Sequence, residues 1–243
     1  MSVVDFIGKI HELSSAKSVW EFSLREFSKC GIASLCHGYA DGKPDDAPLT
    51  LRNNYPEPWK NIYYQRGAYR YDLYAQHVAT STSVIQIDGL QFDSKIKEDS
   101  LLFEEVNDIG NFGINNGFIV PLRLAKNDGF GGMFIGDIPA DEPDPHGFLV
   151  THKHDFLLMA MHLDAKLVQI ATRDAQTEVN LTKRESECLT WLASGMLNDK
   201  IAERLKISNS TVEFHLRNAR HKLKTRTREQ AVAVAIGLGI IKI

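Results

Sequence analysis

Apolar residues in the C-terminal part of the chain recur at helical spacing in four short segments that polar turns separate. In the first segment, Thr182 and Glu185 have the spacing of a capping box ahead of the apolar run CLTWL, and Gly195 marks the end of the helix. The other three segments are NDKIAERL, STVEFHLRNARHKL and REQAVAVAIGLG. This pattern predicts an all-α four-helix unit over residues 181–243.

The third of these segments has an apolar stripe and an opposing polar face. At about 100° per residue, one side of the predicted helix collects Val212, Leu216, Ala219 and Leu223. The opposite side carries polar groups and one aromatic ring, from Ser210, Phe214, Arg217, Asn218 and His221. Arginine and asparagine make bidentate contacts with base edges, whereas serine, threonine and lysine suit phosphates.

A turn of three residues, Lys206 to Ser208, precedes this helix, which Ser208 or Asn209 can cap. A short helix, a short turn and a longer helix with a polar face match the helix-turn-helix arrangement, whose second helix enters the major groove. We therefore predict a surface for double-stranded DNA rather than an ordinary solvated face. Its predicted residues are Lys200, Ser208, Ser210, Thr211, Phe214, Arg217, Asn218, His221 and Lys222.

The charge distribution agrees with this prediction. Residues 175–243 hold 12 Lys+Arg against 7 Asp+Glu, whereas residues 1–174 hold 16 against 24. A small basic unit attached to a larger acidic one indicates that only the small unit meets a polyanion.

The sequence predicts a cytoplasmic protein. The N-terminus has no basic segment followed by an apolar one, and no apolar run approaches the roughly 18 residues of a membrane span. Three cysteines, Cys30, Cys36 and Cys188, without CxxC spacing are typical of reduced thiols.

The chain before residue 171 mixes helical and strand patterns. DFIGKIHEL, SVWEFSLREFSKCG and the stretch from His146 to Ile170 predict helices, the second with an apolar side of Val19, Phe22, Leu24 and Phe27. IASLCHGYA, FIVPLRLA and GGMFIGDI are short and bounded by Gly, Pro or Asp, which predicts strands, and DGKPDDAP predicts a loop. The polar stretch ATRDAQTEVN, residues 171–180, predicts a linker.

The four C-terminal segments resemble the DNA-binding domain of LuxR-type regulators almost throughout. The family's Glu, Leu and Gly markers fall on Glu185, Leu189 and Gly195, and its S-x-x-T-V-x-x-H signature falls on Ser208, Thr211, Val212 and His215. Met196-Leu197 replaces the family's Lys followed by Thr or Ser, which removes a phosphate contact. Lys206 replaces a turn glycine, where a positive φ costs a side chain about 1 kcal/mol.

The stretch YPEPWKNIYYQRGAYRYDLY resembles the autoinducer-binding domain of the quorum-sensing branch, and FGINNGFIVPL resembles its Gly-rich entry into a central strand, with Gly117 on the family's glycine. The resemblance implies an N-acyl-homoserine lactone pocket lined by Tyr55, Trp59, Tyr63 and Asp72. Trp N–H and Tyr O–H groups donate to carbonyls, Asp accepts an amide N–H, and the rings enclose an acyl chain. The alternative is that these aromatic rings only fill the core behind a sheet.

Two positions depart from the family in this region. Leu73 stands in place of the proline of Tyr-Asp-Pro, and Ile87 stands in place of an aromatic residue of the pocket wall. A different or longer ligand, or none, therefore stays open.

Other chemistry is not supported by the sequence. His146, His152, His154 and His162 lack an HExxH pattern or a cysteine partner, so we predict surface histidines rather than a metal site. No Gly-rich phosphate loop, catalytic dyad or GxSxG motif occurs, so neither an enzyme nor a cofactor is predicted.

Together, the residues and the resemblance predict an α+β chain. An α/β/α sandwich sensor with an antiparallel sheet occupies residues 1–170, a linker 171–180, and an all-α helix-turn-helix domain 181–243. The implied function is a transcription regulator gated by a small amphiphile, acting as a homodimer on a near-palindromic site. The alternative is a regulator of the same type without small-molecule input, constitutive or controlled by a protein partner.

Overall fold

A computed structural model describes residues 2–40, 50–88, 101–102, 104, 116–122, 130–137 and 144–242. The predicted loop DGKPDDAP and the last three residues of FIVPLRLA lie outside these residues. The chain forms two compact units, Met1–Leu167 and Val168–Ile243.

The N-terminal unit contains a five-stranded antiparallel sheet in the order β2-β1-β5-β4-β3. Its strands are β1 (Ser34–Ala40), β2 (Thr50–Asn53), β3 (Ile85–Asp88), β4 (Asn116–Pro121) and β5 (Phe130–Gly136). The register places Cys36 of β1 and Ile119 of β4 on either side of Phe134 of β5. The three predicted strands correspond to β1, β4 and β5, whereas β2 and β3 were not predicted.

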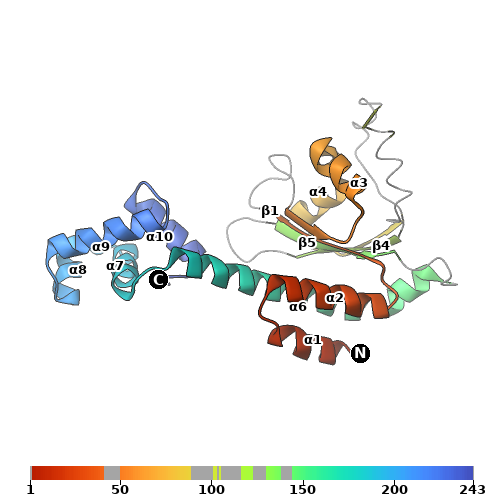
Figure 1. Ribbon diagram of the computed structural model, residues 1–243, viewed down its shortest axis with the longest axis horizontal. Coiled ribbons are helices and arrows are strands. Elements are labelled where there is room, and N and C mark those ends of the chain that lie inside the picture. Colours follow the sequence, from red (N-terminus) through yellow and green to blue (C-terminus); the bar gives the residue numbers. More distant parts are fainter. Residues whose placement is uncertain are drawn as a thin grey trace. The chain divides into compact units, whose positions relative to one another are not determined.

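Helices cover both faces of this sheet (Figure 1). One face carries α1 (Val3–Glu12), α2 (Ala16–Lys29) and the first part of α6 (Pro145–Val179). The other carries α3 (Glu57–Lys60) and α4 (Leu73–Thr80), joined through a π-helical turn, η1 (Asn61–Gln65), and a 3-10 turn, η2 (Ala68–Tyr71). The predicted α/β/α sandwich with an antiparallel sheet is confirmed.

Aromatic rings pack the helices α1, α2 and α6 against one another. Phe6 stacks on Phe22 at 5.3 Å between ring centroids, and Phe27 stacks on Phe156 at 5.9 Å. Of the four residues predicted for the apolar side of α2, Val19, Phe22 and Phe27 are buried and Leu24 is half-buried.

Two polar residues of α2, Ser23 and Glu26, are also buried. They are buried because each is hydrogen-bonded: the Ser23 hydroxyl donates to the Val19 carbonyl at 2.8 Å, and Glu26 accepts from Lys29.

Alternation along β1 assigns neighbouring side chains to opposite layers. His37 points to the α6 side, where its Nε2 lies 2.8 Å from Asp164 Oδ1. Cys36 therefore points to the α3 and α4 side, where a second cluster of buried side chains lies.

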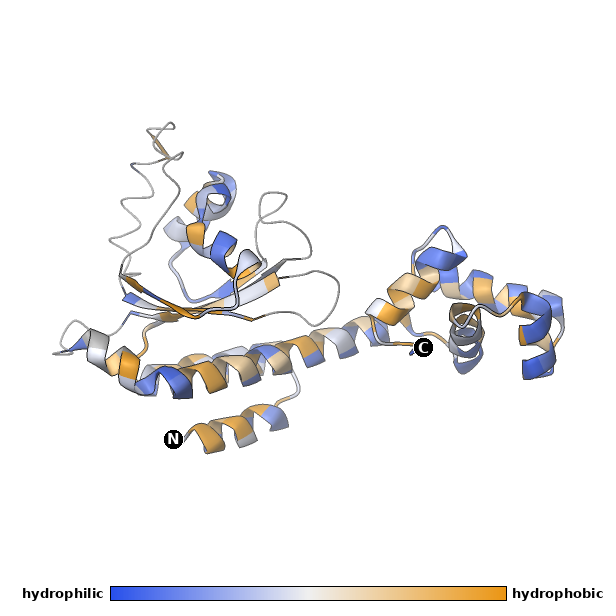
Figure 2. Cartoon of the chain, turned by 180° about the vertical axis from the view of Figure 1, so that it is seen from behind, coloured by the Kyte–Doolittle hydropathy of each residue, from blue (hydrophilic) through white to orange (hydrophobic). Residues whose placement is uncertain are grey.

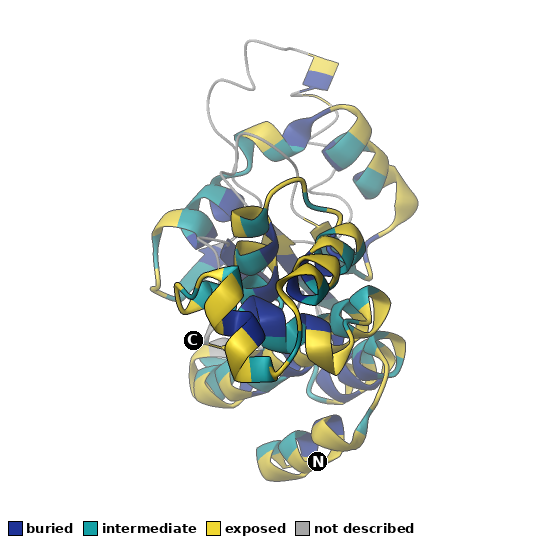
Figure 3. Cartoon of the chain, turned by 90° about the vertical axis from the view of Figure 1, so that its left-hand side faces the viewer, coloured by how far each residue is buried: buried dark blue, intermediate teal, exposed yellow. Residues whose placement is uncertain are grey.

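The C-terminal unit consists of four helices around a small apolar core, with exposed outer faces (Figure 3). They are α7 (Lys183–Ala193), α8 (Asn198–Leu205), α9 (Asn209–Lys222) and α10 (Arg228–Gly237), close to the predicted bounds. The capping box of Thr182 and Glu185 and the Ser208 cap of α9 are both formed. Lys206 keeps the left-handed geometry of a turn glycine, with φ 55°.

Helix α6 is longer than the stretch from His146 to Ile170 that was predicted, since it continues to Val179 through the polar segment 171–180. Hydrophobic and hydrophilic positions alternate along it (Figure 2). Its last turns are held by packing, because Gln176 Nε2 donates to the Leu238 carbonyl at 2.7 Å and Val179 packs on the C-terminal core. The segment predicted as a linker is therefore helical.

Candidate ligand pocket and nucleic-acid interface

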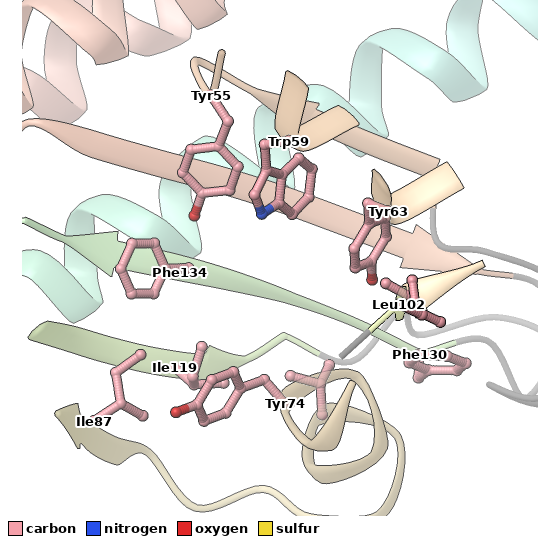
Figure 4. Close-up of a cluster of buried hydrophobic side chains, with 11 residues drawn as sticks. Tyr55, Trp59, Tyr63, Tyr74, Ile87, Leu102, Ile119, Phe130 and Phe134 are labelled. Atoms are coloured by element: carbon pink, nitrogen blue, oxygen red, sulfur yellow. The ribbon is translucent and has the colours of Figure 1, made fainter. Parts of the chain in front are cut away.

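Three aromatic rings form a row on the α3 side of the sheet (Figure 4). Trp59 of α3 and Tyr63 of η1 are one helical turn apart, which brings them to one side, and Tyr55 lies just before α3. The Trp59 and Tyr63 rings stack at 4.6 Å with an interplanar angle of 15°, and Tyr55 meets Trp59 edge-on at 4.7 Å. All three are buried.

This row forms one wall of a cavity that encloses about 560 Å³, counting its mouth. The remaining walls come from α4 and the sheet, and are mostly apolar: Cys36, Gly38, Leu51, Tyr74, Ala75, Val78, Ile119, Gly132, Met133 and Phe134. Figure 4 shows the polar atoms of Tyr55, Trp59 and Tyr63 on the side of the row that faces Phe134 and Ile119. The mostly apolar lining with a few polar groups is typical of a site for a small, largely apolar ligand.

Glycines let the backbone approach closely around this cavity. A Cβ on Gly132 would lie 2.7 Å from the Val78 side chain, and one on Gly117 would collide with the Ile135 carbonyl. Ile87 belongs to the adjoining buried cluster, where the family has an aromatic residue, but it does not line the cavity.

The indole N–H of Trp59 is a donor left unsatisfied by the described part of the chain. Nε1 is fully buried and has no hydrogen-bond partner among the residues that the structure describes, and the whole side chain is only 4% exposed. A buried N–H without an acceptor costs about 1–3 kcal/mol of stability. A ligand carbonyl oxygen that enters the cavity would therefore meet a donor that is already desolvated.

Asp72 supplies a hydrogen-bond acceptor at the Tyr63 end of the row. It caps α4, because Oδ1 accepts from Tyr74 N at 2.8 Å and Ala75 N at 3.1 Å, while Oδ2 accepts from the Tyr63 hydroxyl at 2.9 Å. Each carboxylate oxygen has room for more than one hydrogen bond, so an amide N–H can still be accepted.

Burial controls protonation in the cavity. It raises the pKa of the Cys36 thiol and holds the pKa values of the Tyr55 and Tyr63 hydroxyls well above their usual range. These groups are therefore neutral near pH 7, which leaves Asp72 as the one Asp or Glu carboxyl group that lines the described cavity. The site offers two kinds of polar contact, donors for carbonyls and a carboxylate acceptor, in an apolar enclosure.

The second candidate site is the outer face of α9. The four residues predicted for its apolar stripe, Val212, Leu216, Ala219 and Leu223, are all buried. Phe214, Arg217 and His221 are exposed and Asn218 is half-buried. Helix α9 therefore presents the predicted polar face to solvent.

Hydroxyl groups gather at the start of α9. Ser208 Oγ lies 2.8 Å from Ser210 Oγ and 2.7 Å from Thr211 Oγ1, and it accepts from Thr211 N. Lys200 on α8 is exposed, with its ammonium 3.0 Å from Glu203. All nine predicted DNA-contact residues are exposed or half-buried, on α8, on α9 or at the cap of α9.

Lys222 differs from the others. Its ammonium donates to Glu185 Oε2 at 2.8 Å and to the Asn180 carbonyl at 3.0 Å. Burial raises the pKa of the Glu185 carboxyl, but the hydrogen bonds from Lys222 and Thr182 outweigh it and hold the pKa below its usual value. A phosphate contact by Lys222 would have to compete with these internal partners.

Two further arginines were not predicted. Arg220 and Arg228 line a cleft together with Arg217, beside Glu213 and Leu216. Arg220 follows Arg217 by three residues on α9, a spacing that could have identified it from the sequence. Arg228 comes from α10, and only the tertiary fold brings it to this cleft.

The described residues give no support for a metal site or a membrane span. No group of three or more His, Cys, Asp and Glu side chains there is placed to hold a metal ion. The side chain of His146 lies outside the described residues. No helix in the described part of the chain is both long and apolar enough to cross a membrane.

Both units match known protein families. Residues 179–235 match the family described as bacterial regulatory proteins, luxR family, and residues 15–167 match the autoinducer binding domain. The transcriptional activator protein LuxR of Aliivibrio fischeri is 31% identical over 183 residues, which cover 75% of this chain and 70% of that protein.

A second relative, the quorum sensing-dependent regulator RpaR of Rhodopseudomonas palustris, is 25% identical over 242 residues, covering 99% of this chain and 95% of RpaR. Among solved structures, SdiA in complex with octanoyl-rac-glycerol aligns with a TM-score of 0.68 at 21% identity, covering 99% of this chain and 96% of that one. At this identity, the likeness supports the fold.

Proposed function

Since the chain belongs to the LuxR family of bacterial regulatory proteins and carries its autoinducer-binding domain, we propose that a small amphiphile bound in the N-terminal cavity controls its binding to DNA. The ligand class proposed is an acyl chain joined to a polar head with a carbonyl and an amide, as in the N-acyl-homoserine lactones.

The observation that carries this proposal is the buried indole N–H of Trp59, which has no hydrogen-bond partner among the described residues. If Trp59 only filled the core, an apolar ring could replace it. Its buried N–H instead provides a hydrogen bond for a carbonyl oxygen of the ligand. Asp72 suits the ligand amide, and the walls around Val78, Ile119 and Phe134 suit the acyl chain. SdiA, which shares the fold, has been solved with an octanoyl glycerol.

The DNA-binding role is assigned to α9, its cap and Lys200 in the first turn of α8. Helix α9 lies in the major groove, with Arg217 and Asn218 at base edges and the hydroxyls of Ser208, Ser210 and Thr211 near phosphates. Lys200 and His221 flank this surface, and Phe214 adds an apolar contact.

A homodimer on a near-palindromic site is part of the proposal, because one recognition helix reads only a few base pairs. Helix α6 supports it, since Val150, Leu158 and Met161 are exposed apolar residues on this helix. A second copy of the chain would cover them. Analytical ultracentrifugation of the full chain tests this, and a monomer at micromolar concentration with ligand and DNA present would contradict it.

The pocket assignment is tested by what the purified protein retains. Cells producing the full chain are grown with a panel of N-acyl-homoserine lactones of increasing chain length, and the washed protein is denatured and analysed by mass spectrometry. We expect one chain length to be retained near one molecule per chain, and to be lost from Trp59→Phe. An empty wild-type protein under every condition would favour the alternative, a regulator that is constitutive or controlled by a protein partner. The protein donors already bonded to Asp72 are the observation on which that alternative rests.

A further inference from the structure

Phe214 is an exposed aromatic residue in the middle of the proposed recognition helix. Its side chain is 48% exposed, although Val212 and Leu216 on either side of it are buried in the core. Leaving a large apolar ring in water forgoes the burial that stabilises the other apolar residues of α9. The Phe214 ring is therefore available to a partner that docks on α9.

Arg217 is associated with this ring. The guanidinium carbon of Arg217 lies 5.6 Å from the Phe214 ring centroid, within the range of a cation–π contact, and the His215 ring meets Phe214 edge-on at 5.7 Å. The aromatic ring thus restrains the charged group one helical turn further along. A restrained guanidinium loses less conformational entropy when it forms a bidentate contact.

The chemistry of the major groove limits what each group can recognise. Base edges there present hydrogen-bonding groups at every position except the C5-methyl of thymine, which is the one apolar feature that suits a phenyl ring. The guanidinium suits O6 and N7 of guanine. Three helical residues rise about 4.5 Å and successive base pairs about 3.4 Å, so side chains three residues apart reach neighbouring base pairs.

We propose that Phe214 and Arg217 act as one reading unit for a thymine next to a guanine in each half-site, with the Phe214 ring on the thymine methyl and the Arg217 guanidinium on the guanine. This rests on the proposed function, in which α9 enters the major groove. It adds the identity of a base step and makes Phe214 a determinant of sequence preference.

The first test uses wild-type protein and modified DNA duplexes. The full chain, with any ligand it needs, selects its site from random duplexes, and each thymine of that site is then replaced in turn by uracil, which removes only the C5-methyl. We expect one thymine in each half-site, adjacent to a guanine, at which uracil weakens binding about fourfold, the value of one buried methyl group. The other thymines should tolerate the change.

Variants then assign the contact. Phe214→Ala should bind the thymine and uracil duplexes equally, whereas Phe214→Leu, which keeps an apolar side chain, should retain part of the difference. Val234→Ala, which trims another exposed apolar residue in the same unit, is the matched control and should behave as wild type. Replacing the adjacent guanine by 7-deazaguanine should weaken wild type more than Phe214→Ala, because the variant lacks the ring that restrains Arg217.

The outcomes separate this inference from the proposed function. Binding to a selected site with no thymine next to a guanine, equal tolerance of uracil at every thymine, or an unchanged preference in Phe214→Ala would each overturn the reading unit while leaving DNA binding intact. Failure to select any duplex would overturn both. The uracil scan needs only the wild-type protein, so it tests the reading unit even if Phe214→Ala does not fold.

Discussion

The hydroxyl of Tyr63 donates to Asp72 Oδ2 at 2.9 Å, so the carboxylate of the pocket is anchored by the protein before any ligand arrives. The same residue caps α4 through its other oxygen. The Asp72 side chain therefore has two roles, a structural one in the protein and a proposed one in ligand binding. Variants of Asp72 are needed that affect one role and not the other.

Asp72→Asn separates them because asparagine is as good a helix cap as aspartate. We expect the free energy of unfolding of the ligand-free protein to change by no more than about 1 kcal/mol, while most of the ligand-induced rise in melting temperature disappears. Asp72→Ala also removes the cap, and should cost about 1 kcal/mol more without ligand. Thermal melts with and without an N-acyl-homoserine lactone measure both effects. If the ligand still raises the melting temperature of Asp72→Asn as much as that of wild type, Asp72 has only a structural role.

Burial raises the pKa of the Asp72 carboxyl above its usual 3.8, although hydrogen bonds from Ala75, Tyr63 and Tyr74 act in the opposite direction. A raised pKa in the folded state means that the contribution of this group to stability is complete below 3.8 and is lost as the pH rises through the folded pKa. Wild type should therefore lose stability relative to Asp72→Asn as the pH rises above about 4. Urea denaturation across this range gives the difference. A wild type that instead gains stability relative to Asp72→Asn over this range would contradict the sign.

Trp59→Phe tests the stored donor. Phenylalanine keeps a ring to stack on Tyr63 but carries no N–H. Because the indole N–H has no partner among the described residues, the ligand-free protein should lose only the stability that goes with the smaller buried ring. Ligand affinity should fall by about 1–2 kcal/mol, or roughly 5- to 30-fold.

Isothermal titration with the lactone that wild type retains gives the affinity, and Tyr64→Phe, on the neighbouring half-buried ring, is a matched control for losing one polar atom. A lactone affinity in Trp59→Phe equal to that of wild type would show that the indole N–H makes no contact with the ligand.

Lys222→Ala distinguishes an internal ion pair from a phosphate contact. The Glu185 side chain is only 4% exposed, so removing its cationic partner leaves a buried carboxylate with fewer donors. We expect the C-terminal unit to lose about 3 kcal/mol of stability. Because the pKa of Glu185 is held below its usual 4.5, this contribution is present above 4.5 and is lost as the pH falls through the folded pKa.

The salt dependence of DNA binding should stay the same in Lys222→Ala. A slope that drops by about one unit with stability unchanged would instead support the phosphate contact predicted from the sequence.

Arg217→Ala tests base reading by α9. We expect a loss of about 1–3 kcal/mol at the selected site, with little change at random sequence, so that the preference for the site relaxes. Lys17→Ala, which removes one exposed positive charge from α2, is the control. Equal losses at selected and random duplexes would show that Arg217 contributes charge only.

The C-terminal unit was predictable because its signals are local. Caps such as Thr182 and Ser208 and the spacing from Val212 to Leu223 all act within a few turns of one helix. Its bounds are correspondingly close to those predicted.

The sequence-based predictions were wrong or incomplete where contacts between residues far apart in the chain determine the structure. The four-residue strands β2 and β3 carry little pattern of their own, and they are strands because β1 and β4 supply their partners. The end of α6 is helical through Gln176 and the Leu238 carbonyl, which are 62 residues apart. Likewise, the pairing of Lys222 with Glu185 joins α9 to α7, and no property of α9 alone indicates it. The division at residues 171–180 stays a prediction.

The central claim is that a small molecule in the N-terminal cavity controls DNA binding by the C-terminal unit. Fluorescence anisotropy of the selected duplex, titrated with full-length protein in the presence and absence of the lactone retained by wild type, tests it directly. We expect the lactone to tighten or weaken binding by at least tenfold, about 1.4 kcal/mol, and Trp59→Phe to lose most of this response while binding the duplex as the ligand-free wild type does. The same affinity with and without the lactone would contradict ligand gating.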